Sequence, residues 1–143
     1  MTIIESVRNF IETCPYLPEF RAAVNAQYLG EDVKSYMIES TPVEPVVKRY
    51  TDGSTLRQFA FVFASREYFG PDVIENIDNS GFYEHFADWL EMSTMEGHLP
   101  EMEQGKHPRK ILATTTGYVF NADETKAMYQ IQCRLTYFQE RMI

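Results

Sequence analysis

The three histidines and two cysteines of this 143-residue chain are the residues best suited to bind a metal ion or to act in nucleophilic catalysis. His85, His98 and His107 do not form the i, i+4 pair that brings two imidazoles to one metal ion on a helix. Cys14 and Cys133 form no CxxC motif, so we expect two reduced, buried thiols rather than a disulfide or a zinc site. The motifs GxSxG, GxxxxGKS or GxxxxGKT, GxGxxG and HExxH do not occur. The sequence therefore gives no support to these mechanisms, and we expect no metal or cofactor. The abundant carboxylates have two interpretations, a pair that converges in a cleft for acid–base catalysis or solvated acids on helix surfaces, and the second is the commoner.

Charged residues are distributed unevenly along the chain, which carries 21 acids and 13 basic residues for a net charge of -8. Residues 67–103 contain ten acids and no Lys or Arg, whereas residues 105–143 contain six basic residues and three acids. If these regions also separate in space, the acidic helix of one copy can face the basic strands of the next, in the head-to-tail geometry of rings and filaments. The alternative is that the acids only confer solubility, since the outer faces of helices are commonly charged.

The composition predicts one globular domain over residues 1–143. Hydrophobic residues make up 44% of the chain and aromatic residues 14%, which is too much for an intrinsically disordered segment. The longest apolar runs, such as residues 59–64, are far shorter than the roughly 20 residues that span a bilayer. Glu5 stands where a signal peptide needs basic residues, so we expect neither membrane insertion nor export.

A helix is predicted near the N-terminus, because Thr2 and Glu5 have the spacing of a capping box. Apolar residues follow at intervals of three and four, and Pro15 and Pro18 are expected to end the helix. These apolar residues are Ile3, Ile4, Val7, Phe10, Ile11 and Cys14.

Strands are predicted next, over residues 35–40 and 46–50, with residues 42–45 as an edge or connector. Asp52 and Gly53 lie between two alternating runs and favour a tight hairpin, because both central turn positions adopt positive φ. On the returning strand, Phe59, Phe61 and Phe63 share the face that we expect to enter the core.

The second half of the sequence predicts a helix and two long strands. The helix is capped by Asn79 or Ser80 and runs to about residue 95, with Phe82, Phe86, Trp89 and Leu90 as its apolar stripe. A mobile connector over residues 97–105 precedes strands at 109–120 and 127–138, which are joined by a polar tip at 121–126. This order gives an α+β fold in which helices cover one face of a mainly antiparallel sheet. We expect the other face to be only partly apolar.

Six stretches that extend over nearly the whole chain show a likeness to a known family. They are residues 35–39, 44–53, 59–67, 76–91, 99–100 and 127–137. Through them the chain resembles a small family of tailed-phage proteins, described as minor capsid proteins from bacteriophage and, in Firmicute prophages, as putative tail components. It is similar to the tail terminator proteins, which form a hexameric ring that stops growth of the tail tube and joins the tail to the head.

This resemblance implies a structural protein of the virion that is present in the bacterial cytoplasm during assembly. Its partners would be further copies of itself, the tail tube protein below and the head–tail connector above. DNA would pass through the ring without specific binding, and an acidic lumen would suit that passage, because like charge disfavours contact with phosphates. Proteins of this kind carry no catalytic residues and have no membrane partner.

Two groups of residues are candidates for these contacts. Hairpin tips and basic strand residues are the interface candidates, together with the connector at 97–105, although each of these loops also has the plain interpretation of a surface connection. The interface candidates are Asp52, Gly53, Asn121, Asp123, Glu124, Lys126, Lys106, Arg109, Lys110 and Arg134. The candidates for an acidic lumen or an inter-subunit contact are Glu84, Asp88, Glu91 and Glu96.

Two alternatives remain. One is an α+β domain like the NTF2-like proteins, in which helices roof a curved sheet over an apolar pocket that binds a small ligand. The predicted strands 56–64, 109–120 and 128–138 contain no His or Asp to act as acid or base, which favours ligand binding without catalysis. The other alternative is a different head–tail joining protein, with another number of subunits in its ring.

Overall fold

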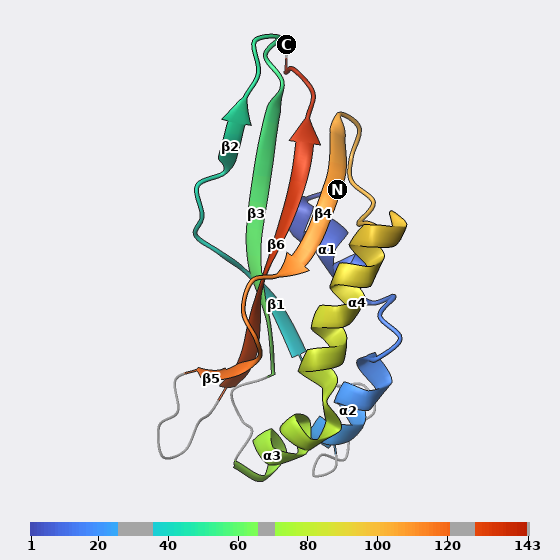
Figure 1. Cartoon of the computed structure of the whole chain (residues 1–143). Coiled ribbons are helices and arrows are strands. Elements are labelled where there is room, and N and C mark those ends of the chain that lie inside the picture. The colour runs from blue at the N-terminus through green and yellow to red at the C-terminus, as the bar shows by residue number, and fades with distance from the viewer. Residues whose placement is uncertain (26–35, 66–70, 121–127, 143) are drawn as a thin grey trace.

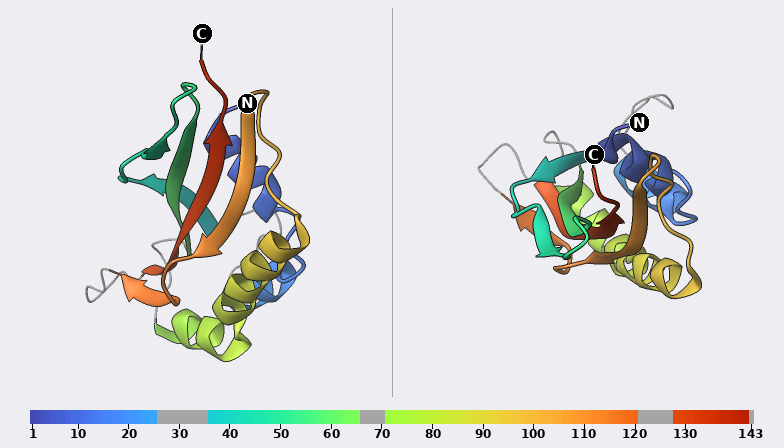
Figure 2. Two further views of the ribbon diagram at one scale, coloured as in Figure 1. Left: turned by 45° about the horizontal axis from the view of Figure 1, so that its top comes forward. Right: turned by 90° about the horizontal axis from the view of Figure 1, so that it is seen from above.

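The computed structural model describes residues 1–25, 36–65, 71–120 and 128–142, and its fold is α+β (Figure 1). An antiparallel sheet of six strands carries the helices on one face, as Figure 2 shows from two further directions. The elements are α1 (Ile3–Ile11), α2 (Leu17–Asn25), β1 (Tyr36–Thr41), β2 (Val46–Arg49), β3 (Thr55–Ser65), α3 (Pro71–Ser80), α4 (Phe82–Glu96), β4 (Lys106–Ala113), β5 (Tyr118–Phe120) and β6 (Met128–Gln139).

The two longest strands, β3 and β6, form the centre of the sheet. The strand order is β1-β3-β6-β4, with β2 also paired to β3 and β5 also paired to β6. The register places Phe61 opposite Cys133 and Phe63 opposite Ile131, so their side chains share one face. The β2–β3 hairpin extends beyond the helices at the upper end of the molecule in Figure 1.

An aromatic core fills the space between this face and the helices. Phe20 of α2 lies with ring centroids 5.3 Å from Phe63 and 4.8 Å from Phe82, and Phe63 lies 4.9 Å from Phe86. These four side chains and Phe61 have no exposed surface. The predicted core face of β3 is thus confirmed, and Cys14 and Cys133 are both free and buried, as expected.

The N-terminal helix has the predicted capping box. Thr2 Oγ1 accepts from Glu5 N at 3.2 Å, and Glu5 Oε2 accepts from Thr2 N at 3.3 Å. Helix α2 was not predicted, because Pro15 and Pro18 were interpreted only as residues that end a helix. Pro18 lies in the first turn of α2, where a missing backbone N–H costs nothing.

The predicted hairpin and the predicted central helix are also present. The turn differs in detail from the predicted one, because Gly53 N donates to Tyr50 O at 3.1 Å. Its central residues are thus Thr51 and Asp52 rather than Asp52 and Gly53, and Gly53, with φ of 93°, follows them.

Helix α4 is preceded by α3, which the sequence analysis missed, and its N-cap is Gly81 rather than Asn79 or Ser80. Ser80 still contributes at this junction, because its Oγ accepts from Phe82 N at 3.2 Å.

The predicted strand at 109–120 is wrong as a single element. It begins earlier, at Lys106, and is divided into β4 and β5, which pair with different stretches of β6. Gly117 lies in the interval between the two strands, where a Cβ would come within 2.7 Å of Tyr129 Cε1 and 2.9 Å of Tyr83 Cβ. The chain therefore passes close beneath α4 at a point that only glycine fits.

Candidate functional site

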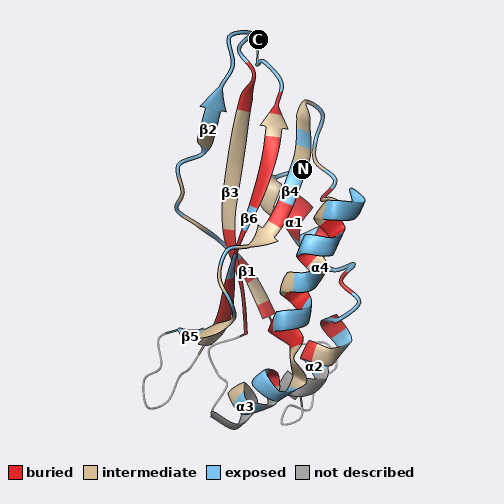
Figure 3. Ribbon diagram, viewed as in Figure 1, coloured by how far each residue is buried: buried red, intermediate tan, exposed pale blue. Residues whose placement is uncertain are grey.

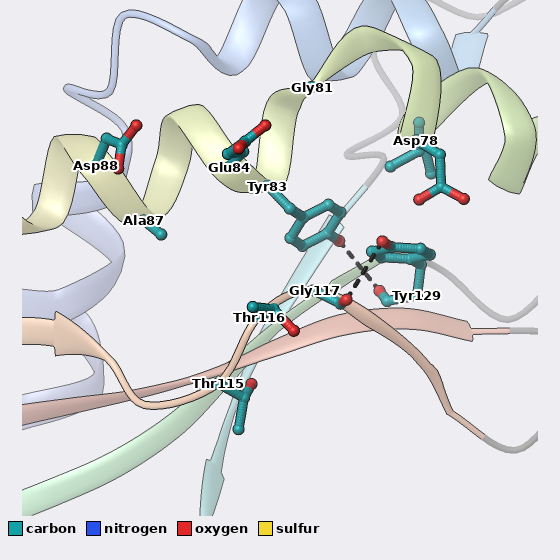
Figure 4. Close-up of a pocket in the computed structure, with 11 residues that line it drawn as sticks. Asp78, Gly81, Tyr83, Glu84, Ala87, Asp88, Thr115, Thr116, Gly117 and Tyr129 are labelled. Atoms are coloured by element: carbon teal, nitrogen blue, oxygen red, sulfur yellow. Dashed lines mark hydrogen bonds between the residues drawn. The ribbon is translucent and has the colours of Figure 1, made fainter.

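A cavity of about 410 Å³ lies where α3 and α4 meet the chain between β4 and β5 (Figure 4). Among the described residues, its polar lining comes from three carboxylates, two threonines and two tyrosines, and includes no Lys or Arg. The lining residues are Ile77, Asp78, Gly81, Tyr83, Glu84, Ala87, Asp88, Thr115, Thr116, Gly117 and Tyr129.

The two tyrosines form the rigid wall of this cavity. Their ring centroids are 4.7 Å apart, Tyr83 OH donates to Tyr129 O at 3.0 Å, and Tyr129 OH donates to Gly117 O at 3.3 Å. Burial raises the pKa of both phenols, that of Tyr129 to about 12, and the neighbouring Asp78 carboxylate raises the pKa of Tyr129 further in the same direction. Both hydroxyls are therefore neutral at physiological pH, and each already donates its proton to a backbone carbonyl of the cavity wall.

A groove of about 260 Å³ lies on the opposite, helix-free face of the sheet, and we call it the open-face groove. Leu112 pairs with Arg134 and Lys110 with Thr136, whereas the intervening pair, Ile111 and Leu135, faces the core. The groove thus combines an apolar floor with two exposed cations and includes no acid. Its lining residues are Val47, Leu56, Gln58, Lys110, Leu112, Ala113, Thr114, Arg134 and Thr136.

The predicted acids Glu84, Asp88, Glu91 and Glu96 are all exposed on α4, whose outward surface is pale blue in Figure 3. Glu84 and Asp88 also border the cavity, so the acidic surface and the cavity are continuous. In the part of the chain that the structure describes, none of the four acids forms an ion pair. These acids therefore form a surface of α4 on which no described cation pairs with them.

Three of the predicted basic residues lie apart from the acids of α4. Lys110 and Arg134 line the open-face groove, and among the described residues neither has a carboxylate within ion-pair distance. Arg109 is the residue at the register shift in β4, with its guanidinium 5.3 Å from the Phe138 ring centroid. Lys106 instead pairs with Glu103, which lowers the pKa of that carboxyl.

The hairpin tip at Asp52 and Gly53 is exposed and well ordered by local contacts. Asp52 Oδ1 accepts from Ser54 Oγ at 2.5 Å and from Ser54 N at 2.9 Å, and these two hydrogen bonds lower the pKa of the Asp52 carboxyl. Gly53 N donates to Tyr50 O at 3.1 Å. Gly53 also lies against Arg141, whose Cγ would be 3.1 Å from a Cβ at that position. Local hydrogen bonds and the contact with Arg141 therefore give this exposed tip a defined conformation.

The second predicted tip, Asn121, Asp123, Glu124 and Lys126, lies outside the described residues. The connector at 97–105 is described, and it packs on the core through Leu99 and Met102. Ser6 Oγ donates to Glu101 O at 2.5 Å, which ties this connector to α1. We had expected this connector to be mobile, but its central part is anchored.

Sequence reasoning missed the apolar part of both surfaces. Val47 is 52% exposed beside the groove, and Met92 and Met95 are 55% and 77% exposed on α4. The sequence could have indicated that Met92 and Met95 are exposed, because both lie outside the apolar stripe of the helix. Single exposed apolar residues are common, however, so only their grouping with unpaired charge makes them informative.

No protein-family model matches the chain, and a search of curated proteins finds no significant relative. Within the described ranges, no cluster of three or more His, Cys, Asp or Glu residues could hold a metal ion. No helix in those ranges is long and apolar enough to span a bilayer. The two oppositely charged surfaces and the cavity are thus the features on which a function can be argued.

Proposed function

We propose that this chain is a structural protein of a bacteriophage tail, a tail terminator or related minor tail or capsid component. Its copies would form a ring, hexameric by analogy with the terminators it resembles, that ends the tail tube and joins it to the head. The observation that carries the proposal is the placement of acids on α4 and of cations on the helix-free sheet face, with no ion pair formed by either group among the described residues. A subunit with two unlike faces associates head to tail, and such contacts close into rings when the rotation between subunits permits.

Charge also bears on the passage of DNA through such a ring. Acids of α4 that do not contact a neighbouring copy, such as Glu84 beside the cavity, would face the lumen. Negative charge there disfavours binding of phosphates, so DNA would move through without being held. The tail tube protein and the head–tail connector would occupy the two ends of the ring. The protein would be part of the virion and would be found in the bacterial cytoplasm during assembly.

Deletion of the gene from the phage or prophage that carries it tests this function. After induction, negative-stain electron microscopy of the lysate should show filled, unjoined heads beside tails of excessive or scattered length. Supplying the protein from a plasmid should restore joined particles with uniform tails. Normal infectious particles in the deletion lysate would contradict the proposal.

A second candidate function, binding of a small ligand, is favoured by the cavity between α3, α4 and Gly117. Its volume of about 410 Å³ lies in the range of about 300–1,000 Å³ that small-molecule sites occupy. Because aromatic side chains fill the space between sheet and helices, this cavity lies at the edge of the core rather than under a helical roof. Thermal stabilisation by a member of a small-ligand panel at micromolar concentration would support this alternative.

A further inference from the structure

The open-face groove has the features of a docking site for a surface that is both apolar and acidic. Its floor contains Leu56 and Leu112, and Lys110 and Arg134 stand exposed beside it. In the described ranges no helix covers this face, because α1 to α4 pack on the other side of the sheet. Two cations without a carboxylate among the described residues leave the groove complementary to a partner that carries negative charge.

The outward side of α4 combines apolar and acidic side chains, and we call it the acidic stripe. Glu84, Asp88, Glu91 and Met95 follow one another at intervals of four, three and four, so they share one face of the helix. Met95 is 77% exposed at one end of the stripe, and Met92 is 55% exposed at its side. The stripe thus places an exposed apolar side chain directly beside carboxylates.

Except for Glu84 in the first turn, the acids on the exposed side of α4 oppose the stability of their own helix. Neighbouring carboxylates three and four residues apart repel one another. Glu91 and Glu96 lie near the C-terminal end of α4, where the helix dipole is negative and where the last turn has no basic residue. A cationic partner would relieve this repulsion. The acids of α4 are therefore better accommodated in a complex than in the isolated subunit.

We propose that α4 of one copy docks in the open-face groove of a second copy of this chain. Met95 would lie on Leu56 and Leu112, while Asp88 and Glu91 would meet Lys110 and Arg134. The stripe belongs to α4 and the groove to the helix-free face of the sheet, so the contact joins two different surfaces and can repeat from copy to copy. The inference rests on the proposed ring and deepens it by naming the two faces that meet.

Reciprocal charge reversal tests this contact in the purified full chain. The Asp88→Lys/Glu91→Lys variant would set cations against the cationic groove, and the Lys110→Glu/Arg134→Glu variant would set acids against the acidic stripe. Each variant alone should remain monomeric in sedimentation velocity, whereas wild type should assemble at low salt. Mixing the two variants should restore assembly, because each complementary pair of faces is then present in alternating copies. The Glu75→Lys/Glu101→Lys variant changes net charge equally on exposed residues away from the stripe and should assemble like wild type.

Salt and cross-linking supply two further readouts. Raising NaCl from about 0.1 M to about 1 M shortens the Debye length from about 10 Å to about 3 Å and should shift wild type toward monomer. After oxidation, the Met95→Cys/Leu112→Cys variant should give a ladder of disulfide-linked multimers on a non-reducing gel. Met95→Cys alone should give no product larger than a dimer, because Cys14 and Cys133 are buried and one accessible thiol can link only one other chain.

The outcomes separate the contact from the proposed function. Assembly that survives both reversals, or mixed variants that remain monomeric while wild type assembles, would overturn this contact and leave the tail role to the deletion experiment. A wild-type protein that stays monomeric at low salt, with no ladder from the double cysteine variant, would also overturn it. Normal particles from the deletion, together with rescue by mixing, would instead show that the chain self-associates for another purpose.

Discussion

Thr94 of α4 closes the outer edge of β4 by exchanging two hydrogen bonds with the backbone of Ile111. Its Oγ1 accepts from Ile111 N at 3.0 Å and donates to Ile111 O at 2.8 Å. A helix side chain thus takes the place of a neighbouring strand, so the backbone groups of a fully buried residue are satisfied without a further sheet partner. The same contact fixes α4 on the sheet, and with it the direction of the acidic stripe.

Replacing Thr94 with valine should therefore cost about 1–3 kcal/mol of unfolding free energy, because both backbone groups of Ile111 lose their partner at constant side-chain volume. Urea denaturation followed by circular dichroism measures this loss. The Thr94→Ser variant keeps the hydroxyl and should lose much less. A valine variant as stable as wild type would show that water satisfies Ile111 and that Thr94 does not anchor the helix.

Gly117 is the second sensitive position, because the chain there passes between two tyrosines. In the Gly117→Ala variant the new methyl would lie 2.7 Å from Tyr129 Cε1 and 2.9 Å from Tyr83 Cβ. We expect a loss of about 1–3 kcal/mol in unfolding free energy from this overpacking.

The exposed neighbour Thr116 supplies the control, since Thr116→Ala should change stability by no more than about 0.5 kcal/mol. Comparing the two variants by thermal and urea denaturation separates the close approach from general sensitivity of this segment. Equal stability of both variants would mean that β4 and β5 can move apart without cost.

Alkaline pH should destabilise the folded protein. Burial raises the pKa of Cys14 from 9.0 to about 11, and it raises the pKa of Tyr36 and Tyr129 from 10.0 to about 12. A folded pKa above the unfolded value stabilises the protein fully below the unfolded pKa, and this stabilisation is lost as pH rises through the folded pKa. The free energy of unfolding should thus fall from about pH 9 toward about pH 12.

Urea midpoints measured between pH 7 and pH 11 test this dependence. The Tyr36→Phe variant provides a comparison, because it lacks one of the phenols and its hydrogen bond to Glu12 Oε1 at 2.7 Å. It should be less stable than wild type near pH 8 and should lose less stability above pH 10. A wild-type midpoint that stays constant across this range would contradict the assignment.

Local rules were sufficient for the elements that depend on neighbouring residues. The Thr2 and Glu5 spacing predicted the start of α1, and the Asp52-Gly53 pair predicted the hairpin, because capping and turn geometry are set within four residues. Alternation in β3 likewise predicted the core face, since side chains on a strand alternate whatever the fold.

The features that local rules did not predict depend on packing between residues far apart in the sequence. Nothing near Gly117 in the sequence indicates that Tyr83 and Tyr129 approach it, so the break between β4 and β5 was not predictable. The charge segregation was visible in the sequence, but its division between opposite faces was not. That division depends on α4 packing on β4 through contacts such as Thr94 with Ile111, while Lys110 and Arg134 point to the other side.

The most direct test of the central claim is the position of this protein in the assembled particle. The C-terminal end is suited to a tag, because Met142 is 72% exposed at the end of the chain that follows β6. Gold labelling of a functional tagged protein, with cryo-electron microscopy of the same particles, should place a ring of copies where the tail meets the head. Purified infectious particles that contain no copy of the chain, or copies only away from that junction, would contradict the account.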